Sequence, residues 1–198
     1  AEMMGMKVDP NTLYGSLYRK ALEGDADCGG LLSYNYFSGE GVTDLDEGRS
    51  LFVRTPDARL TLANFMRTHL LSALATLKIG LDILTKEERV AINCLYGHGG
   101  FFKTPQVGQR MLSAAVAAPV SVMETAGEGG PYGMALLAAY MLWKAEGETL
   151  PDYLDHQVFA HAKTETLMAD AADIQGFAAF LERYQRGLPL EKLATEVL

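Results

Sequence analysis

The residues of this sequence best suited to chemistry are the run Gly97-His98-Gly99-Gly100. A compact apolar stretch, residues 90–96, precedes the run, and a helix-forming stretch with Val107 and Met111 follows it. Glycine lets a ligand approach the backbone closely, and amide groups at the start of a helix favour negative charge. Open α/β sheets bind ligands just beyond the carboxyl ends of their strands. The run therefore suits a phosphate-bearing ligand, and a tight turn without a ligand is the alternative.

The same run does not match either of the common phosphate-binding motifs. No glycine stands three residues after Gly100, so it is not GxGxxG, and Lys103-Thr104 lacks the glycine spacing of a P-loop. His98 has no serine, cysteine or carboxylate placed with it by local spacing, so a structural role is favoured over a catalytic one. A second glycine-rich turn, Glu128-Gly129-Gly130, begins a later helix, where Glu128 would compensate the helix dipole.

The elements that must position these residues alternate between helix and strand. In order, we expect a helix from Asp9-Pro10, strands at 31–37 and 51–54, a helix from Thr61 to Leu84, a strand at 90–96, a helix around Val107 to Ala115, a strand at 120–123, a helix from Glu128, and helical sequence after Pro151. The helix from Thr61 carries leucines at steps of three and four, including Leu62, Leu70 and Leu77, which we expect to face the sheet. Such alternation predicts an α/β layer with helices on a largely buried sheet.

Composition and charge exclude several classes of protein. The chain has 198 residues, of which 48% are hydrophobic and 21% charged, as in a folded globular domain. Its net charge of -8 argues against a protein that binds the nucleic-acid backbone. No apolar run reaches the roughly 18 residues of a membrane span, and no signal-peptide pattern is seen, so cytoplasmic residence is expected. The spacings of Cys28 and Cys94, and of His156 and His161, match no metal motif.

Three blocks of sequence follow one another in a distinctive order. They are Gly29-Gly30-Leu31-Leu32 leading to Ser38-Gly39-Glu40, then Gly99-Gly100 followed by Thr104 and Gln109, and then Pro119-Val120 followed by Glu128 and Gly133-Met134-Ala135. In this order they resemble the carboxy-terminal half of the FGGY family of carbohydrate kinases, which includes xylulose, ribulose and glycerol kinases. Their family counterparts are a glycine-leucine strand with a Ser-Gly-Glu turn, an adenosine motif, and a Pro-Val strand with a Glu-x4-Gly-x-Ala helix.

The resemblance implies a fold and a division of the chain. The fold is the α/β fold of an actin-like ATPase (ribonuclease H-like) lobe, a mixed sheet with flanking helices and a helical C-terminal extension. Residues 1–28 would be a helical segment continuing from an upstream lobe, and residues 29–147 the actin-like nucleotide-binding domain. The break from Gly147 to Pro151 would separate that domain from the helical extension, residues 148–198.

The resemblance also implies a function. The chain would be the adenosine-binding lobe of an ATP-dependent, xylulokinase-like kinase that phosphorylates a ketose or polyol, with ATP and Mg²⁺ as cofactors. The implied nucleotide-binding residues are Gly97, Gly99, Gly100, Phe101 and Thr104: the glycine pair would pass beneath the adenosine and α-phosphate, and Thr104 would face the adenine. The catalytic aspartate and the sugar site would belong to an N-terminal lobe upstream. No catalytic or metal-binding residue is therefore assigned here, and the chain alone is expected to be inactive. A homodimer is one option for assembly, and no nucleic-acid or membrane partner is expected.

Several residues depart from the family pattern. Thr104 stands where asparagine is common, the pair Phe101-Phe102 is bulkier than usual, His98 replaces a small or acidic residue, and Gly41 replaces an arginine. These departures keep open a non-catalytic actin-like interaction or regulatory module. Another actin-like phosphotransferase, such as an acetate kinase, is a further alternative, although the spacing of Gln109 favours a sugar kinase.

Overall fold

The computed structural model describes residues 5–125, 127 and 129–198 of the chain. The helix-dipole role predicted for Glu128, and its place in the Glu-x4-Gly pattern, therefore concern a residue outside the described part. Within that part, no helix is both long enough and apolar enough to cross a membrane.

The first elements are a helix and a two-stranded hairpin. Helix α1 (Pro10–Ala21) begins as predicted, because the Asp9 carboxylate accepts a hydrogen bond from the Thr12 amide at 2.8 Å and Pro10 occupies the first turn. Strand β1 (Leu31–Tyr34) pairs antiparallel with β2 (Leu51–Arg54). β1 is shorter than the predicted strand at 31–37, whereas β2 has the predicted bounds.

Helix α2 (Leu62–Asp82) buries a different face from the one predicted. Thr61 caps it by accepting from the Asn64 amide at 3.1 Å. Leu70 and Leu74 are each 5% exposed, but Leu62 and Leu77 are 54% and 47% exposed. The prediction that one continuous leucine stripe lies against the sheet is therefore wrong. The reason is that α2 packs against α1, β1, helix α3 (Val107–Val116) and helix α6 (Ala171–Val197), which together cover only one side of it.

The glycine-rich run at residues 97–100 begins at the end of a strand of a three-stranded sheet. β3 (Leu95–Gly97) runs parallel to β4 (Val120–Met123), and β4 pairs antiparallel with β5 (Thr164–Leu167). Helix α3 (Val107–Val116) connects β3 to β4. Two expectations need correction. The strand predicted at 90–96 is limited to β3, and β5 lies in the stretch predicted to be helical. Its polar Thr-Glu-Thr-Leu sequence pairs with β4 through the backbone and through the hydroxyls of Ser121 and Thr166, 2.7 Å apart.

The chain ends in the long helix α6 (Ala171–Val197), which begins where Asp170 accepts from the Asp173 amide at 2.8 Å. Phe177, Phe180 and Tyr184 are buried in the same core as residues of α2 and α3. Gly187 permits this packing, since a Cβ there would lie 2.0 Å from the Tyr34 hydroxyl. The division at residues 28 and 147 stays a prediction.

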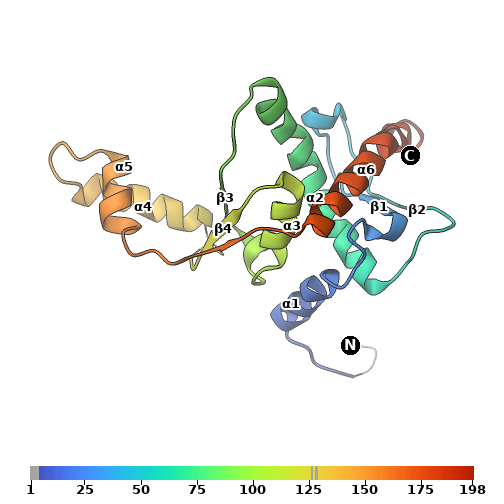
Figure 1. Cartoon of the computed structure of the whole chain (residues 1–198), viewed down its shortest axis with the longest axis horizontal. Coiled ribbons are helices and arrows are strands. Elements are labelled where there is room, and N and C mark those ends of the chain that lie inside the picture. Colours follow the sequence, from blue (N-terminus) through green and yellow to red (C-terminus); the bar gives the residue numbers. More distant parts are fainter. Residues whose placement is uncertain (1–4, 126, 128) are drawn as a thin grey trace.

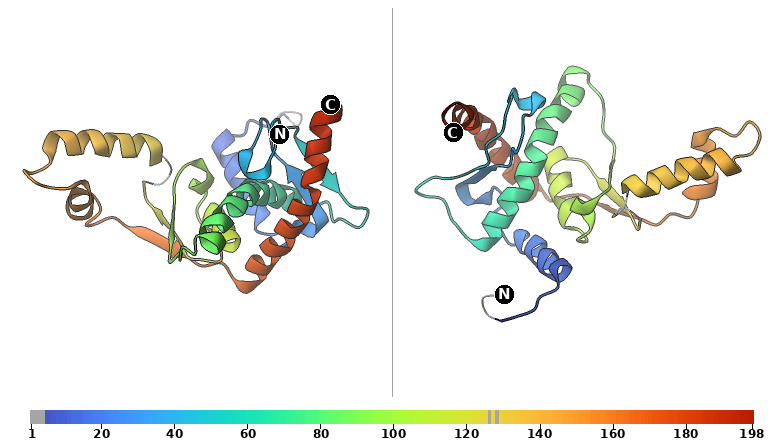
Figure 2. Two further views of the ribbon diagram at one scale, coloured as in Figure 1. Left: turned by 90° about the horizontal axis from the view of Figure 1, so that it is seen from above. Right: turned by 180° about the vertical axis from the view of Figure 1, so that it is seen from behind.

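A separate arm leaves this body between β4 and β5. It consists of α4 (Gly129–Trp143), the short helix α5 (Leu150–Tyr153) and a wide helical turn at residues 154–158. Figures 1 and 2 show the arm extending to one side of the molecule, away from α1, α2 and α6.

Candidate functional site

The glycine loop follows the carboxyl end of β3, as predicted. It passes through Gly99 into a single helical turn, Gly100–Phe102, before α3 begins. Gly99 has φ 98° and ψ −175°, a conformation that side-chain-bearing residues rarely adopt. A Cβ built on Gly99 or on Gly100 would meet no atom within 4 Å. Both residues therefore leave open space in front of the backbone.

The other two predicted residues of the loop serve packing. A Cβ on Gly97, which is buried, would lie 2.4 Å from the Phe102 ring, so glycine is needed there to admit that ring. Phe101 is half-buried, with its ring edge-on to Tyr18 at a centroid distance of 6.4 Å. A Cβ on Gly108 would lie 2.2 Å from the Phe101 carbonyl oxygen. Two glycines thus accommodate the bulky phenylalanine pair.

A cavity of about 720 Å³ lies between the loop and α1. The loop contributes Gly100, Lys103, Thr104 and Pro105, and α1 contributes Asn11, Tyr14, Gly15, Tyr18 and Arg19. Two of the predicted residues, Gly100 and Thr104, therefore face one space. The aromatic and basic side chains of α1 were not predicted to lie there, because the contact between α1 and the loop joins residues distant in sequence.

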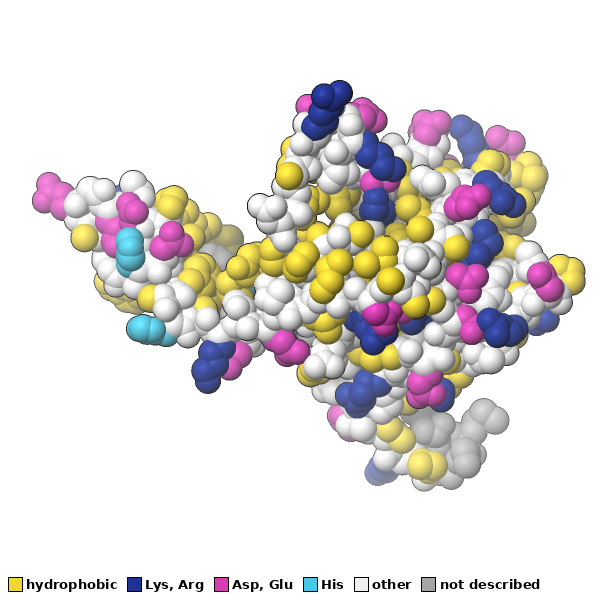
Figure 3. All heavy atoms as spheres, viewed as in Figure 1, with side chains coloured by type: hydrophobic (Ala, Val, Ile, Leu, Met, Phe, Trp, Pro, Cys, Tyr) yellow, Lys and Arg dark blue, Asp and Glu magenta, His cyan; other side chains and the backbone are white. Residues whose placement is uncertain are grey.

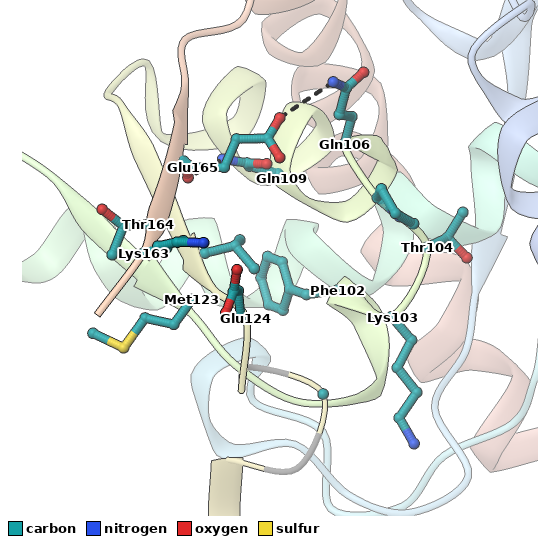
Figure 4. Close-up of a pocket in the computed structure, with 13 residues that line it drawn as sticks. Phe102, Lys103, Thr104, Gln106, Gln109, Met123, Glu124, Lys163, Thr164 and Glu165 are labelled. Atoms are coloured by element: carbon teal, nitrogen blue, oxygen red, sulfur yellow. Dashed lines mark hydrogen bonds between the residues drawn. The ribbon is translucent and has the colours of Figure 1, made fainter. Parts of the chain in front are cut away.

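A second cavity, of about 440 Å³, lies on the other side of Thr104, toward β4 and β5. Figure 4 shows the side chains of Phe102, Glu124 and Lys163 at one end of it and those of Gln106 and Glu165 at the other. The Gln106 side-chain amide donates to the Glu165 carboxylate at 3.2 Å. This cavity mixes both signs of charge, and Gly99 and Gly100 do not line it.

Gln109, part of the block that resembles an adenosine motif, forms hydrogen bonds with the sheet through its side chain. Its buried amide nitrogen donates to the carbonyl oxygens of Val120 at 2.7 Å and Glu165 at 2.8 Å. These two bonds link α3 to β4 and β5. Gln109 therefore stabilises the packing of α3 on β4 and β5. Its side-chain nitrogen already makes two hydrogen bonds within the protein.

A cluster of charged residues fixes α3 to the rest of the body. The buried Arg67 of α2 donates to Asp173 at 2.6 Å, and Arg110 of α3 contacts both Asp173 and Asp170. Burial alone would raise the pKa of Asp173, but the hydrogen bonds from Arg110 and Arg67 outweigh it and hold that pKa below its usual value. The helix that follows the glycine loop is thereby anchored to α2 and α6.

These features define a mixed α/β domain with an open glycine loop at the end of a parallel strand. The family model described as "FGGY family of carbohydrate kinases, C-terminal domain" matches residues 3–142. The chain therefore belongs to the FGGY family of carbohydrate kinases, as the three sequence blocks indicated. A comparison with curated protein sequences gave no significant match.

Solved structures share the fold at low sequence identity. The xylulose kinase from Rhodospirillum rubrum is 18% identical with a TM-score of 0.67, and the match covers 91% of this chain and 34% of that one. For the gluconate kinase from Lactobacillus acidophilus the values are 16%, 0.63, 87% and 34%. For the glycerol kinase from Plasmodium falciparum, whose structure is with ADP, they are 15%, 0.61, 88% and 33%. This likeness confirms the predicted actin-like fold, and the chain spans about a third of the length of these kinases.

Proposed function

We propose that this chain is the nucleotide-binding lobe of an ATP-dependent sugar kinase. The adenosine would bind in the cavity between α1 and the glycine loop. One observation carries the assignment: Gly100, whose backbone faces open space, lines the same cavity of about 720 Å³ as Thr104. Both residues belong to the block that resembles the family's adenosine motif.

The side chains around this cavity fit a nucleotide. Tyr14, which is 62% exposed, and the half-buried Tyr18 offer aromatic faces for stacking on a base. Arg19 and Lys103 supply positive charge for the oxygens of the α-phosphate, which AMP, ADP and ATP share, and the backbone at Gly100 can be approached without hindrance. The mixed-charge cavity toward β4 and β5 is a weaker candidate, because Thr104 lines both cavities but Gly100 lines only the one beside α1.

In the complete protein, bound MgATP would supply the phosphoryl group, and this lobe would hold the adenosine so that the group is correctly placed. Among the described residues, no group of three or more His, Cys, Asp or Glu side chains is arranged to hold a metal ion. Following the family resemblance, we propose that Mg²⁺ binding, the catalytic aspartate and the sugar site belong to another lobe of the complete protein, which would be cytoplasmic. The named relatives are kinases of xylulose, gluconate and glycerol, which are all polyhydroxy compounds, and we propose a ketose or polyol as substrate.

The rival function, a regulatory module without turnover, drew support from Thr104 and from the bulk of Phe101 and Phe102. Gly97 and Gly108 make room for the two rings, so their bulk does not close the loop. Thr104 keeps a hydroxyl that can donate to or accept from an adenine nitrogen. These observations favour the kinase lobe.

Nuclear magnetic resonance of the isotope-labelled chain tests the proposal. AMP, ADP and ATP should each bind at about millimolar affinity, since the adenosine provides most of the contact and a millimolar complex is worth roughly 4 kcal/mol. The amide signals of Tyr14, Gly15 and Gly100 should shift, and those of Lys163 and Thr164 should serve as the comparison for the other cavity. A strong preference for ATP, shifts confined to Lys163 and Thr164, or sugar phosphorylation by the chain alone would contradict it.

A further inference from the structure

Helix α1 lines the proposed nucleotide cavity with one face, and the first turn of that face carries an asparagine. Asn11, Tyr14, Gly15 and Tyr18 recur at steps of three and four, so they lie on the same side of the helix. Asn11 is exposed, and within the described part of the chain its side-chain amide makes no hydrogen bond. The donor and the acceptor of this amide are therefore both available to a ligand.

The two ends of this face differ in charge. Two residues before Asn11, the Asp9 carboxylate caps the helix by accepting from the amide of Thr12 at 2.8 Å and from its hydroxyl at 2.9 Å. These hydrogen bonds hold the pKa of Asp9 below its usual value, so Asp9 is negatively charged at neutral pH. Further along the helix, the guanidinium of Arg19 lies over Gly15. The α-phosphate of a bound nucleotide would therefore lie near Arg19, and its base near Asn11.

The other groups around the cavity do not distinguish one base from another. Tyr14 and Tyr18 can stack on any base, since every base has an aromatic face. The hydroxyl of Thr104 can donate or accept, so it serves adenine and guanine alike. The surface around α1, at the bottom of Figure 3, carries both basic and acidic side chains, so its charge does not select a base either. Of the described residues that line the cavity, Asn11 alone has a side-chain amide.

We propose that Asn11 selects adenine over guanine in this cavity, a role that rests on the proposed nucleotide-binding function. A side-chain amide can accept from the 6-amino group of adenine through its oxygen and donate to N7 through its nitrogen. Guanine presents two acceptors, O6 and N7, on the same edge, so the amide oxygen would face another acceptor. Asn11 is thus a specificity-determining residue that contacts the base, and the cap formed by Asp9 and Thr12 fixes its position in the first turn.

Titration of AMP and of GMP into the isotope-labelled chain, followed by nuclear magnetic resonance, tests this role. The unaltered chain should bind AMP about tenfold more tightly than GMP, since one bidentate pair gives discrimination of this order. Asn11→Ala should make the two affinities nearly equal, because only the unselective contacts remain. Asn11→Asp should reverse the preference, because a carboxylate accepts from both N1–H and the 2-amino group of guanine.

Three controls accompany these variants. Asn11 is exposed, and an acidic residue in the first turn of a helix is favourable, so both variants should fold, as circular dichroism would verify. Asn93→Ala removes an exposed asparagine that lines neither cavity, and it should keep the preference of the unaltered chain. Tyr14→Ala should weaken AMP and GMP binding alike, because stacking does not depend on the identity of the base.

The outcomes separate the role of Asn11 from nucleotide binding itself. If the preference for AMP survives in both Asn11 variants, or if the unaltered chain binds GMP as tightly as AMP, Asn11 does not select the base although the cavity binds a nucleotide. If neither AMP nor GMP binds the unaltered chain, the proposed nucleotide-binding function is wrong, and Asn11 has no such role.

Discussion

The two halves of the glycine loop use glycine for opposite reasons. At Gly97 and at Gly108, just beyond the loop, a Cβ would collide with Phe102 and with the Phe101 carbonyl. At Gly99 and Gly100 a Cβ would meet nothing within 4 Å. The first pair therefore serves the packing of the protein, whereas the second pair leaves the backbone accessible. The difference shows that glycine in such a loop indicates a ligand only where the space in front of it is open.

The largest loss of stability is expected at a buried residue of helix α2. Leu74 of α2 is 5% exposed, and Leu74→Ala should lower the free energy of unfolding by about 2–5 kcal/mol, since it leaves a cavity. Leu77, only one turn away and 47% exposed, is the matched control. Denaturant unfolding should show a clearly smaller loss for Leu77→Ala. Equal losses would mean that Leu77 is packed as tightly as Leu74, which would contradict the face assigned to α2.

A smaller loss is expected at the packed glycine next to the loop. Gly108→Ala brings a Cβ against the Phe101 carbonyl oxygen, and the backbone must shift to admit it. We expect a loss of about 1–3 kcal/mol in thermal or denaturant unfolding, the usual range for overpacking. Gly41→Ala is the control, because a Cβ there meets nothing within 4 Å. A variant at Gly108 as stable as this control would remove the distinction between the two kinds of glycine.

Sequence alone predicted the elements whose signals are local. The cap at Asp9-Pro10 gave the start of α1, and the apolar runs at 51–54 and 120–123 gave β2 and β4 at their observed bounds. β5 was not predicted, because Thr164 to Leu167 is mostly polar and forms a strand only by pairing with β4. The face that α2 buries was misassigned for a similar reason, since α1, α3 and α6 decide it.

The candidate site also contains residues that could be predicted from the sequence and residues that could not. Gly100 and Thr104 were accessible to motif reasoning, because their spacing resembles a family pattern within a few residues. Tyr14, Tyr18 and Arg19 were not, since α1 meets the loop only through contacts between residues distant in sequence. The role of Gln109 was also hidden, because its two acceptors belong to strands that the sequence did not place side by side.

The central claim is that a nucleotide binds against the open backbone at Gly100, and one comparison of affinities tests it most directly. Gly100→Val would place a branched side chain in the cavity beside Thr104, while Gly41→Val adds the same group at an open position outside it. Both variants should unfold within about 0.5 kcal/mol of the unaltered chain, the usual size for surface substitutions. ADP titration should show that Gly41→Val keeps its affinity and that Gly100→Val loses it. Unchanged ADP affinity in a folded Gly100→Val variant would contradict the proposed site.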